Sequence, residues 1–112
     1  MEYPLVLKIT KSNTRVHLVL KIVPELEAFN GHFENALIVP GVVQIQWAVK
    51  YAQLHFQELP QVQVEALEVL KFQKVIQPNS EVELEIKLIN NKLVFVFLSG
   101  DIKHSSGKIV IS

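Results

Sequence analysis

The segment of residues 41–58 predicts a helix that is buried on nearly every side. It contains no glycine or proline after Gly41, and Pro60, a residue type that ends helices, follows it. Its apolar residues point in almost all directions around a helix: Val42, Val43, Ile45, Trp47, Ala48, Val49, Tyr51, Ala52, Leu54 and Phe56. Because a surface helix needs an apolar stripe of only ~100°, we expect the rest of the fold to surround this one.

The remaining apolar residues are spaced as in β-strands. Residues 81–88 alternate strictly between charged and apolar side chains, which is the period of a strand with one buried face. We predict strands at residues 5–9, 16–23, 62–76, 82–89, 93–102 and 108–111, with turns at residues 11–14, 90–91 and 105–107. The apolar parity slips between Val64 and Leu67, which predicts a β-bulge.

One helix enclosed by five or six antiparallel strands is the architecture of an α+β hot-dog fold. We therefore expect a single hot-dog domain over residues 1–112, with one long central helix wrapped by the sheet. Periodicity alone leaves other α+β folds open.

Composition excludes several classes of function. The 11 basic and 11 acidic side chains cancel, so there is no net field to hold a nucleic acid. The chain has no cysteine, which rules out disulfides, thiol nucleophiles and thiolate metal sites. No uncharged run approaches the length of a membrane span, and the apolar run before Lys8 is too short for a signal sequence. We expect a soluble, cytoplasmic protein without a membrane partner.

Two short motifs precede and open the predicted helix. Gly31-His32-Phe33 is followed by Pro40-Gly41-Val42, and together they resemble the signature of the hot-dog 3-hydroxyacyl-(acyl carrier protein) dehydratases of the FabZ and FabA type. Residues 22–28, 69–72, 75–78 and 97–102 resemble further parts of that family, so the resemblance covers roughly the whole chain. The segment PGVVQIQWA and the short length of the chain are similar to the ApeI-like subgroup, which is associated with aryl polyene and related pathways.

The resemblance implies a role for each residue of the motif. Eliminating water from a 3-hydroxyacyl thioester requires a base at the α-carbon, a donor for the developing enolate oxygen, and a proton for the departing hydroxide. His32 suits the first role, since an imidazole titrates near neutral pH. Gly41 suits the second, because its N–H stands at a helix start without a side chain in the way. We expect Phe33, Val42 and Trp47 to contact substrate beside it.

The third role is where the sequence departs from the family. The family places a carboxylic acid on the helix, contributed across a dimer interface, and Gln46 occupies that position. An amide donates a hydrogen bond but cannot deliver a proton. Glu34 is one candidate replacement. The other is a paralogous hot-dog subunit that supplies the missing acid across the interface, in which case His32 still serves as the base.

Three functions therefore stay open. The first is a dehydratase-like subunit acting on 3-hydroxyacyl thioesters of acyl carrier protein, in fatty acid or aryl polyene type biosynthesis, as a homodimer or a heterodimer with a paralogue. The second is a hot-dog acyl thioesterase. The third is a non-catalytic subunit that binds the carrier protein. Four lysines are available for an acidic carrier protein: Lys71, Lys74, Lys103 and Lys108. No spacing of ligands or glycines predicts a metal or another cofactor.

The other histidines are expected to be structural. His17 lies in a predicted strand, His55 lies near the helix end, and His104 precedes the predicted Ser-Ser-Gly turn. None has the glycine and Pro-Gly surroundings of His32.

Overall fold

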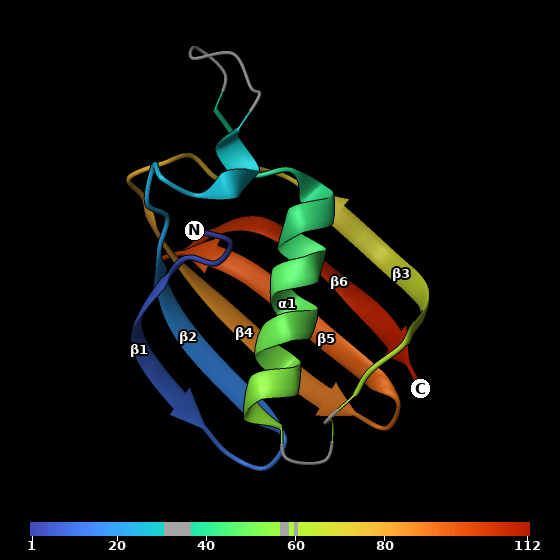
Figure 1. Cartoon of the computed structure of the whole chain (residues 1–112). Coiled ribbons are helices and arrows are strands. Elements are labelled where there is room, and N and C mark those ends of the chain that lie inside the picture. Colours follow the sequence, from blue (N-terminus) through green and yellow to red (C-terminus); the bar gives the residue numbers. More distant parts are fainter. Residues whose placement is uncertain (31–36, 57–58, 60) are drawn as a thin grey trace.

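A six-stranded antiparallel sheet curls around one helix in this computed structural model, which describes residues 1–30, 37–56, 59 and 61–112 (Figure 1). The elements in chain order are β1 (Leu5–Lys11), β2 (Arg15–Lys21), the 3-10 turn η1 (Glu27–Phe29), α1 (Gly41–His55), β3 (Val64–Phe72), β4 (Glu81–Ile89), β5 (Lys92–Ser99) and β6 (Ile102–Ile111). The predicted α+β hot-dog fold is confirmed.

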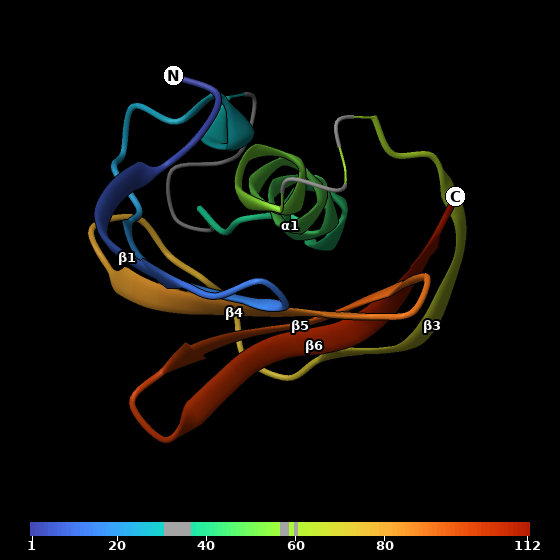
Figure 2. The ribbon, with the colours of Figure 1, turned by 90° about the horizontal axis from the view of Figure 1, so that it is seen from below.

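The sheet has the strand order β1-β2-β4-β5-β6-β3, and α1 lies in its concave side (Figure 2). The alternation in β4 has the predicted effect: Val82, Leu84 and Ile86 are buried, while Glu83 and Glu85 are half-buried on the opposite face. Similar alternation in β2 and β5 contributes further buried side chains to the face of the sheet that packs in the core. The predicted strands at residues 5–9 and 16–23 are also confirmed, and they pair as the antiparallel hairpin of β1 and β2.

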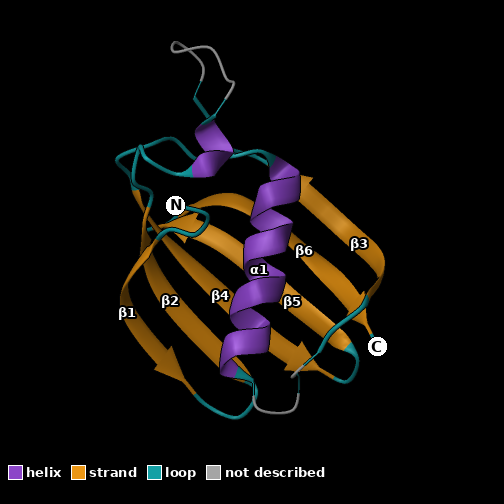
Figure 3. Cartoon of the chain, in the orientation of Figure 1, coloured by secondary structure: helices purple, strands orange, loops and turns teal. Residues whose placement is uncertain are grey.

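The helix is covered on one side by the sheet and on another by the N-terminal segment. Ala48 and Ala52 are fully buried, and their small side chains allow α1 to approach the sheet closely. Val42 and Leu54, however, expose 63% and 59% of their surface. The expectation that this chain alone surrounds its helix is therefore wrong in part, because a single curled sheet leaves the outer face of α1 open (Figure 3).

The last strand differs from the prediction. Residues 105–107 do not form a turn; β6 runs through them, and the turn between β5 and β6 lies at Gly100 and Asp101. Gly100 has φ +60°, where glycine is favoured. Gly107 serves a different purpose, because a β-carbon there would come within 2.5 Å of Leu70 and 3.0 Å of Phe95. A glycine that packing requires was mistaken for a turn glycine.

The edge strand β3 ends at Phe72, four residues before the predicted end at Ile76. The predicted bulge is confirmed, since the register against β6 shifts between Val64 and Ala66, and shifts again between Glu68 and Lys71. β3 is last in the strand order, so its outer edge pairs with no other strand of the described chain. Four large apolar side chains of this strand are exposed: Val64, Leu67, Val69 and Phe72.

Candidate functional site

The structure brings the predicted site residues together only in part. His32, Phe33 and the alternative acid Glu34 lie outside the described residues. Gly41, Val42, Gln46 and Trp47 all lie on the first two turns of α1. The site is therefore built here from the helix and its neighbours.

The helix begins at Gly41, directly after Pro40. The Pro40 carbonyl accepts hydrogen bonds from the N–H groups of Val43 and Gln44, both at 3.1 Å. The first N–H groups of a helix have no acceptor within the helix, and the helix dipole adds partial positive charge at this end. The start of α1 can therefore polarise a carbonyl oxygen that approaches it.

The Phe72 ring, from the end of β3, lies against Gly41. A β-carbon on Gly41 would come within 2.8 Å of the ring atoms Cε1 and Cζ. Phe72 is 50% exposed, so its ring covers the helix start without being locked in the core. A side chain at this position would thus have to displace the Phe72 ring, and it would also stand where a substrate is predicted to approach.

A pocket of about 240 Å³ opens at this contact. It is bounded by the residues before the helix, the first turn of α1 and the residues after β3: Ile38, Val39, Gly41, Gln44, Phe72, Gln73, Lys74 and Val75. Four of these side chains are apolar, and the others are the two amides of Gln44 and Gln73 and the Lys74 ammonium group. A mostly apolar lining with a few polar groups suits an acyl thioester, which combines an apolar acyl chain with a polar carbonyl group.

Three residues that hold this pocket, Gln44, His104 and Ser105, were not predicted from the sequence to belong to a site. Gln44 is buried, and its amide accepts a hydrogen bond from Ser105 Oγ at 2.6 Å and donates one to the Val39 carbonyl at 3.1 Å. His104, the neighbour of Ser105, lies 3.3 and 3.2 Å from the carbonyl oxygens of Lys74 and Val75. Nothing in the sequence indicates that Gln44 contacts Ser105. A glutamine on an otherwise apolar helix does indicate that its amide needs hydrogen-bond partners.

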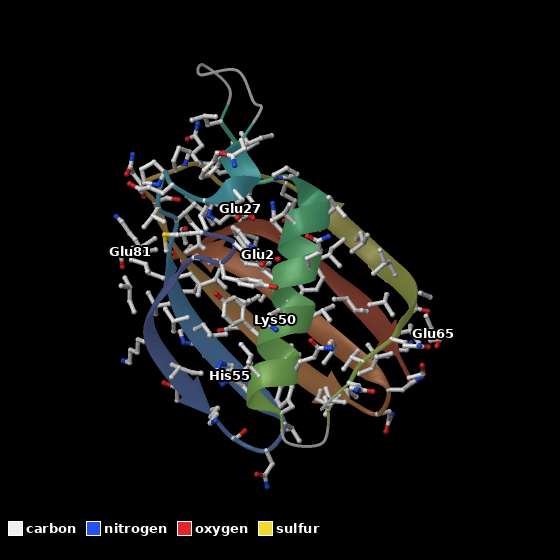
Figure 4. All side chains as sticks on the ribbon, viewed as in Figure 1. Glu2, Glu27, Lys50, His55, Glu65 and Glu81 are labelled. Carbon is white, nitrogen blue, oxygen red and sulfur yellow. The ribbon has the colours of Figure 1, made fainter. Side chains whose placement is uncertain are left out.

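Gln46 is exposed and lines a second pocket, of about 360 Å³. The other lining residues are Glu2, Tyr3, Glu27, Ala28, Val43 and Trp47. Glu2 and Glu27 both lie beside the N-terminal half of α1 (Figure 4). Burial, together with the neighbouring Glu2 carboxylate, raises the pKa of Tyr3. Two carboxylates of the same chain, Glu2 and Glu27, thus share a pocket with Gln46. The sequence did not predict this, because these residues are far apart along the chain.

The remaining two predicted contact residues occupy opposite environments. Val42 is among the most exposed apolar residues of the described chain, whereas Trp47 is 1% exposed. The Trp47 indole N–H donates to the Glu2 carbonyl at 3.3 Å, and the Tyr51 hydroxyl donates to the Pro4 carbonyl at 3.4 Å. Both aromatic residues thus fasten the N-terminal segment to the helix. A role of Trp47 or Val42 in substrate binding stays a prediction.

The three other histidines have protein partners. His17 Nε2 lies 2.9 Å from the Glu83 carboxylate. His55 stacks on Tyr51, and burial, with the nearby Lys11 ammonium, lowers its pKa. His104 Nε2 lies 2.7 Å from Ser99 Oγ, in addition to the backbone contacts of Nδ1. These contacts agree with structural roles.

No cluster of three or more His, Cys, Asp or Glu that could hold a metal ion occurs within residues 1–30, 37–56, 59 and 61–112. Over the same residues, the structure contains no helix with the length and apolar character needed to cross a membrane.

Comparison with known proteins shows that the sequence matches a known family. The family model described as "ApeI-like: ApeI dehydratase" matches residues 8–108. No curated protein matches the sequence.

Solved structures give the same picture. The chain is similar to a chain of the dehydratase heterocomplex ApeI:P from Xenorhabdus doucetiae, with 29% identity over 96% of each chain and a TM-score of 0.86. It is similar to an uncharacterized protein from Erwinia carotovora subsp. atroseptica, with 30% identity, a TM-score of 0.78, and coverage of 100% of this chain and 96% of that one. An inactive CurJ dehydratase mutant shares the fold at 19% identity and a TM-score of 0.64, covering 98% of this chain and 43% of that one.

Proposed function

Because the chain belongs to the ApeI-like dehydratase family, we propose that it is one subunit of a dehydratase acting on 3-hydroxyacyl thioesters of an acyl carrier protein. The observation that carries the proposal is the family match over residues 8–108. It includes the Pro-Gly helix start and Phe72. The biosynthetic context is of the fatty acid or aryl polyene type.

In this proposal the thioester carbonyl points at the start of α1. The Gly41 N–H and the helix dipole stabilise the enolate oxygen that forms when the α-proton leaves. His32 is the base that takes this proton. The pocket bounded by Gly41, Phe72 and Val75 offers apolar walls to the substrate next to the reacting carbon.

The proton for the departing hydroxide comes from a second hot-dog subunit. Gln46 cannot donate a proton as an acid does, and it is exposed on the outer face of α1, where a partner subunit can approach. The outer edge of β3 and the exposed Val42 offer further surface for that partner. The similarity to a chain of a dehydratase heterocomplex supports pairing with a paralogue over a homodimer with two equal sites.

Three carboxylates of the same chain compete with this explanation. Glu34 follows His32-Phe33 in the sequence, and Glu2 and Glu27 share the pocket of Gln46. If one of them were the acid, the purified chain would be active by itself, and replacing that glutamate by glutamine would remove the activity.

Docking of the carrier protein is assigned to the rim of the substrate pocket. Carrier proteins are acidic, and Lys74 lines the pocket while being exposed. Lys71, Lys103 and Lys108 are exposed as well, but Lys103 lines a different pocket with Glu85 and Val96. Lys74 is therefore the first lysine to replace when carrier binding is measured.

The test is mass spectrometry of a 3-hydroxyacyl carrier protein incubated with the chain alone and then with an acid-bearing homologous subunit. We expect loss of water only in the mixture, and no turnover when His32→Ala is used in this chain. Loss of the whole acyl group would instead identify a thioesterase. An unchanged acyl carrier protein that still binds both subunits would identify a non-catalytic carrier-binding protein.

A further inference from the structure

We propose that Gln44 is a positioning residue of the thioester site, held by Ser105 so that it fixes the backbone just before the helix start. The proposal rests on the proposed function, because it assigns this role at the same pocket. It concerns a different glutamine from Gln46, and one that touches no reacting atom.

The anchor of this arrangement is an irregularity in β6. Leu98 pairs with Lys103, but the preceding residue of β5, Phe97, pairs with Ser105, so His104 is an extra residue in the ladder. Consecutive residues of a regular strand face opposite sides of the sheet. With the bulge, His104 and Ser105 are both buried, at 7% and 0% exposure. Both side chains contact residues that line the pocket: Ser105 contacts Gln44, and His104 contacts the carbonyls of Lys74 and Val75.

Ser105 acts on one wall of the pocket through Gln44. Its hydroxyl donates to Gln44 Oε1 at 2.6 Å, and Gln44 Nε2 donates to the Val39 carbonyl at 3.1 Å. Val39 is held on its other side as well, since its N–H donates to the Ile76 carbonyl at 2.9 Å. Val39 is two residues before Gly41, so these bonds fix the direction in which the chain enters α1.

His104 acts on the opposite wall. Its Nδ1 lies near the carbonyl oxygens of Lys74 and Val75, and its own carbonyl accepts from the N–H groups of Gln73 and Lys74, at 2.9 and 3.1 Å. The two walls of the pocket are thus held by two adjacent residues of one strand. This gives the wall next to Gly41 a fixed position relative to the wall that contains Lys74.

The chemical consequence follows from the direction of the Gly41 N–H. A donor that stabilises an enolate oxygen acts through its exact distance and alignment, and a displacement of about 1 Å can cost roughly 10²-fold in rate. Removing the Gln44 amide leaves the Ser105 hydroxyl and the Val39 carbonyl buried without these partners. Residues 37–41 then shift so that these polar groups find other partners, and the Gly41 N–H shifts with them.

The experiment is a titration of the full isotope-labelled chain with butyryl-pantetheine, a thioester that has no 3-hydroxyl group and so cannot be dehydrated. The amide resonance of Gly41 reports the contact with the thioester carbonyl. We expect this resonance to shift in the unmodified chain. In Gln44→Leu and Ser105→Ala, we expect binding to weaken by roughly tenfold or more.

Gln44→Glu separates positioning from packing, because a protonated carboxyl group has nearly the shape of the amide. Protonated, it donates to the Val39 carbonyl and accepts from Ser105; ionised, it cannot donate. We therefore expect Gln44→Glu to bind butyryl-pantetheine at low pH and to lose binding as pH rises, while the unmodified chain binds throughout. Equal binding at all pH values would show that only side-chain volume matters.

Ile109→Val is the matched control, since it shortens a buried side chain of the same strand without changing a hydrogen bond of Gln44. It should lose some stability but keep the Gly41 shift. Gln44→Leu binding as tightly as the unmodified chain would overturn this proposal alone. If the unmodified chain shows no Gly41 shift either alone or mixed with the acid-bearing homologous subunit, the proposed function fails and takes this proposal with it, so the two failures are distinguishable.

Discussion

The Phe72 ring lies directly on Gly41, at a distance that leaves no room for a β-carbon. This contact joins the end of an edge strand to the start of the only long helix of the described chain. It places an aromatic wall beside the N–H group that is proposed to polarise the substrate.

Gly41→Ala should therefore affect activity far more than stability. The nearest atoms belong to the far end of the Phe72 side chain, which is half exposed and can turn outward, so we expect the free energy of unfolding to change by about 1 kcal/mol or less. The methyl group and the displaced ring then obstruct the thioester. Urea unfolding and the dehydration assay measure the two effects, and Phe72→Leu alone is the control for the ring. Unchanged turnover in Gly41→Ala would contradict the assigned carbonyl site.

Gln46→Glu should give the purified chain an acid of its own. General acid catalysis typically contributes ~10²- to 10⁴-fold, so we expect the chain without a partner to gain dehydratase activity within that range. Gln53→Glu, which adds the same charge to the same helix two turns later, should give no gain. If the unmodified chain is already as active as Gln46→Glu, an acid is present elsewhere in it, and Glu34, Glu2 and Glu27 become the residues to replace.

Removing residues 1–4 should expose Trp47. The segment accepts the indole N–H of Trp47 at the Glu2 carbonyl and the Tyr51 hydroxyl at the Pro4 carbonyl, and two such hydrogen bonds contribute about 1–3 kcal/mol together. Trp47 is the only tryptophan of the chain, so a red shift of its fluorescence reports the exposure directly. A truncated chain with the original emission and the original urea midpoint would show that other residues cover the indole.

Tyr51 makes stability depend on pH at the alkaline end. Burial, with a smaller effect from Tyr3, raises its pKa to about 12 from the usual 10. The folded state therefore keeps the phenol neutral while the unfolded state ionises, so this contribution is complete below pH 10 and is lost as pH rises through about 12. Tyr51→Phe should unfold with a shallower dependence on pH between these values. Identical pH profiles of the urea midpoint would mean that the phenol ionises equally in both states.

The sequence predicted the fold because the fold depends on local periodicity. The two-residue alternation in β4 and the absence of any polar face in α1 left little freedom in how the two could bury their apolar surfaces. The same local reasoning failed at Gly107. A glycine before a charged residue and after two serines has the composition of a turn, yet the position requires glycine because Leu70 and Phe95 fill the space where a side chain would be.

For a related reason, only part of the candidate site could be predicted from the sequence. Gly41 and Gln46 stand in a motif of adjacent residues, so their roles could be proposed from the motif and its chemistry. Gln44, Ser105 and His104 have partners in other elements, and the bulge at His104 and Ser105 cannot be predicted from the residue types. Glu2 and Glu27 reach the pocket of Gln46 only because the N-terminal segment and η1 lie against the helix.

Local sequence is enough to predict which surfaces must be buried and which residue types can do the chemistry, because hydrophobic periodicity and side-chain functional groups are properties of neighbours along the chain. Which distant polar groups meet depends on how the whole chain packs. A hydrogen bond such as that from Ser105 to Gln44 depends on the register and bulges of a whole sheet, and these are settled when the chain packs as a unit.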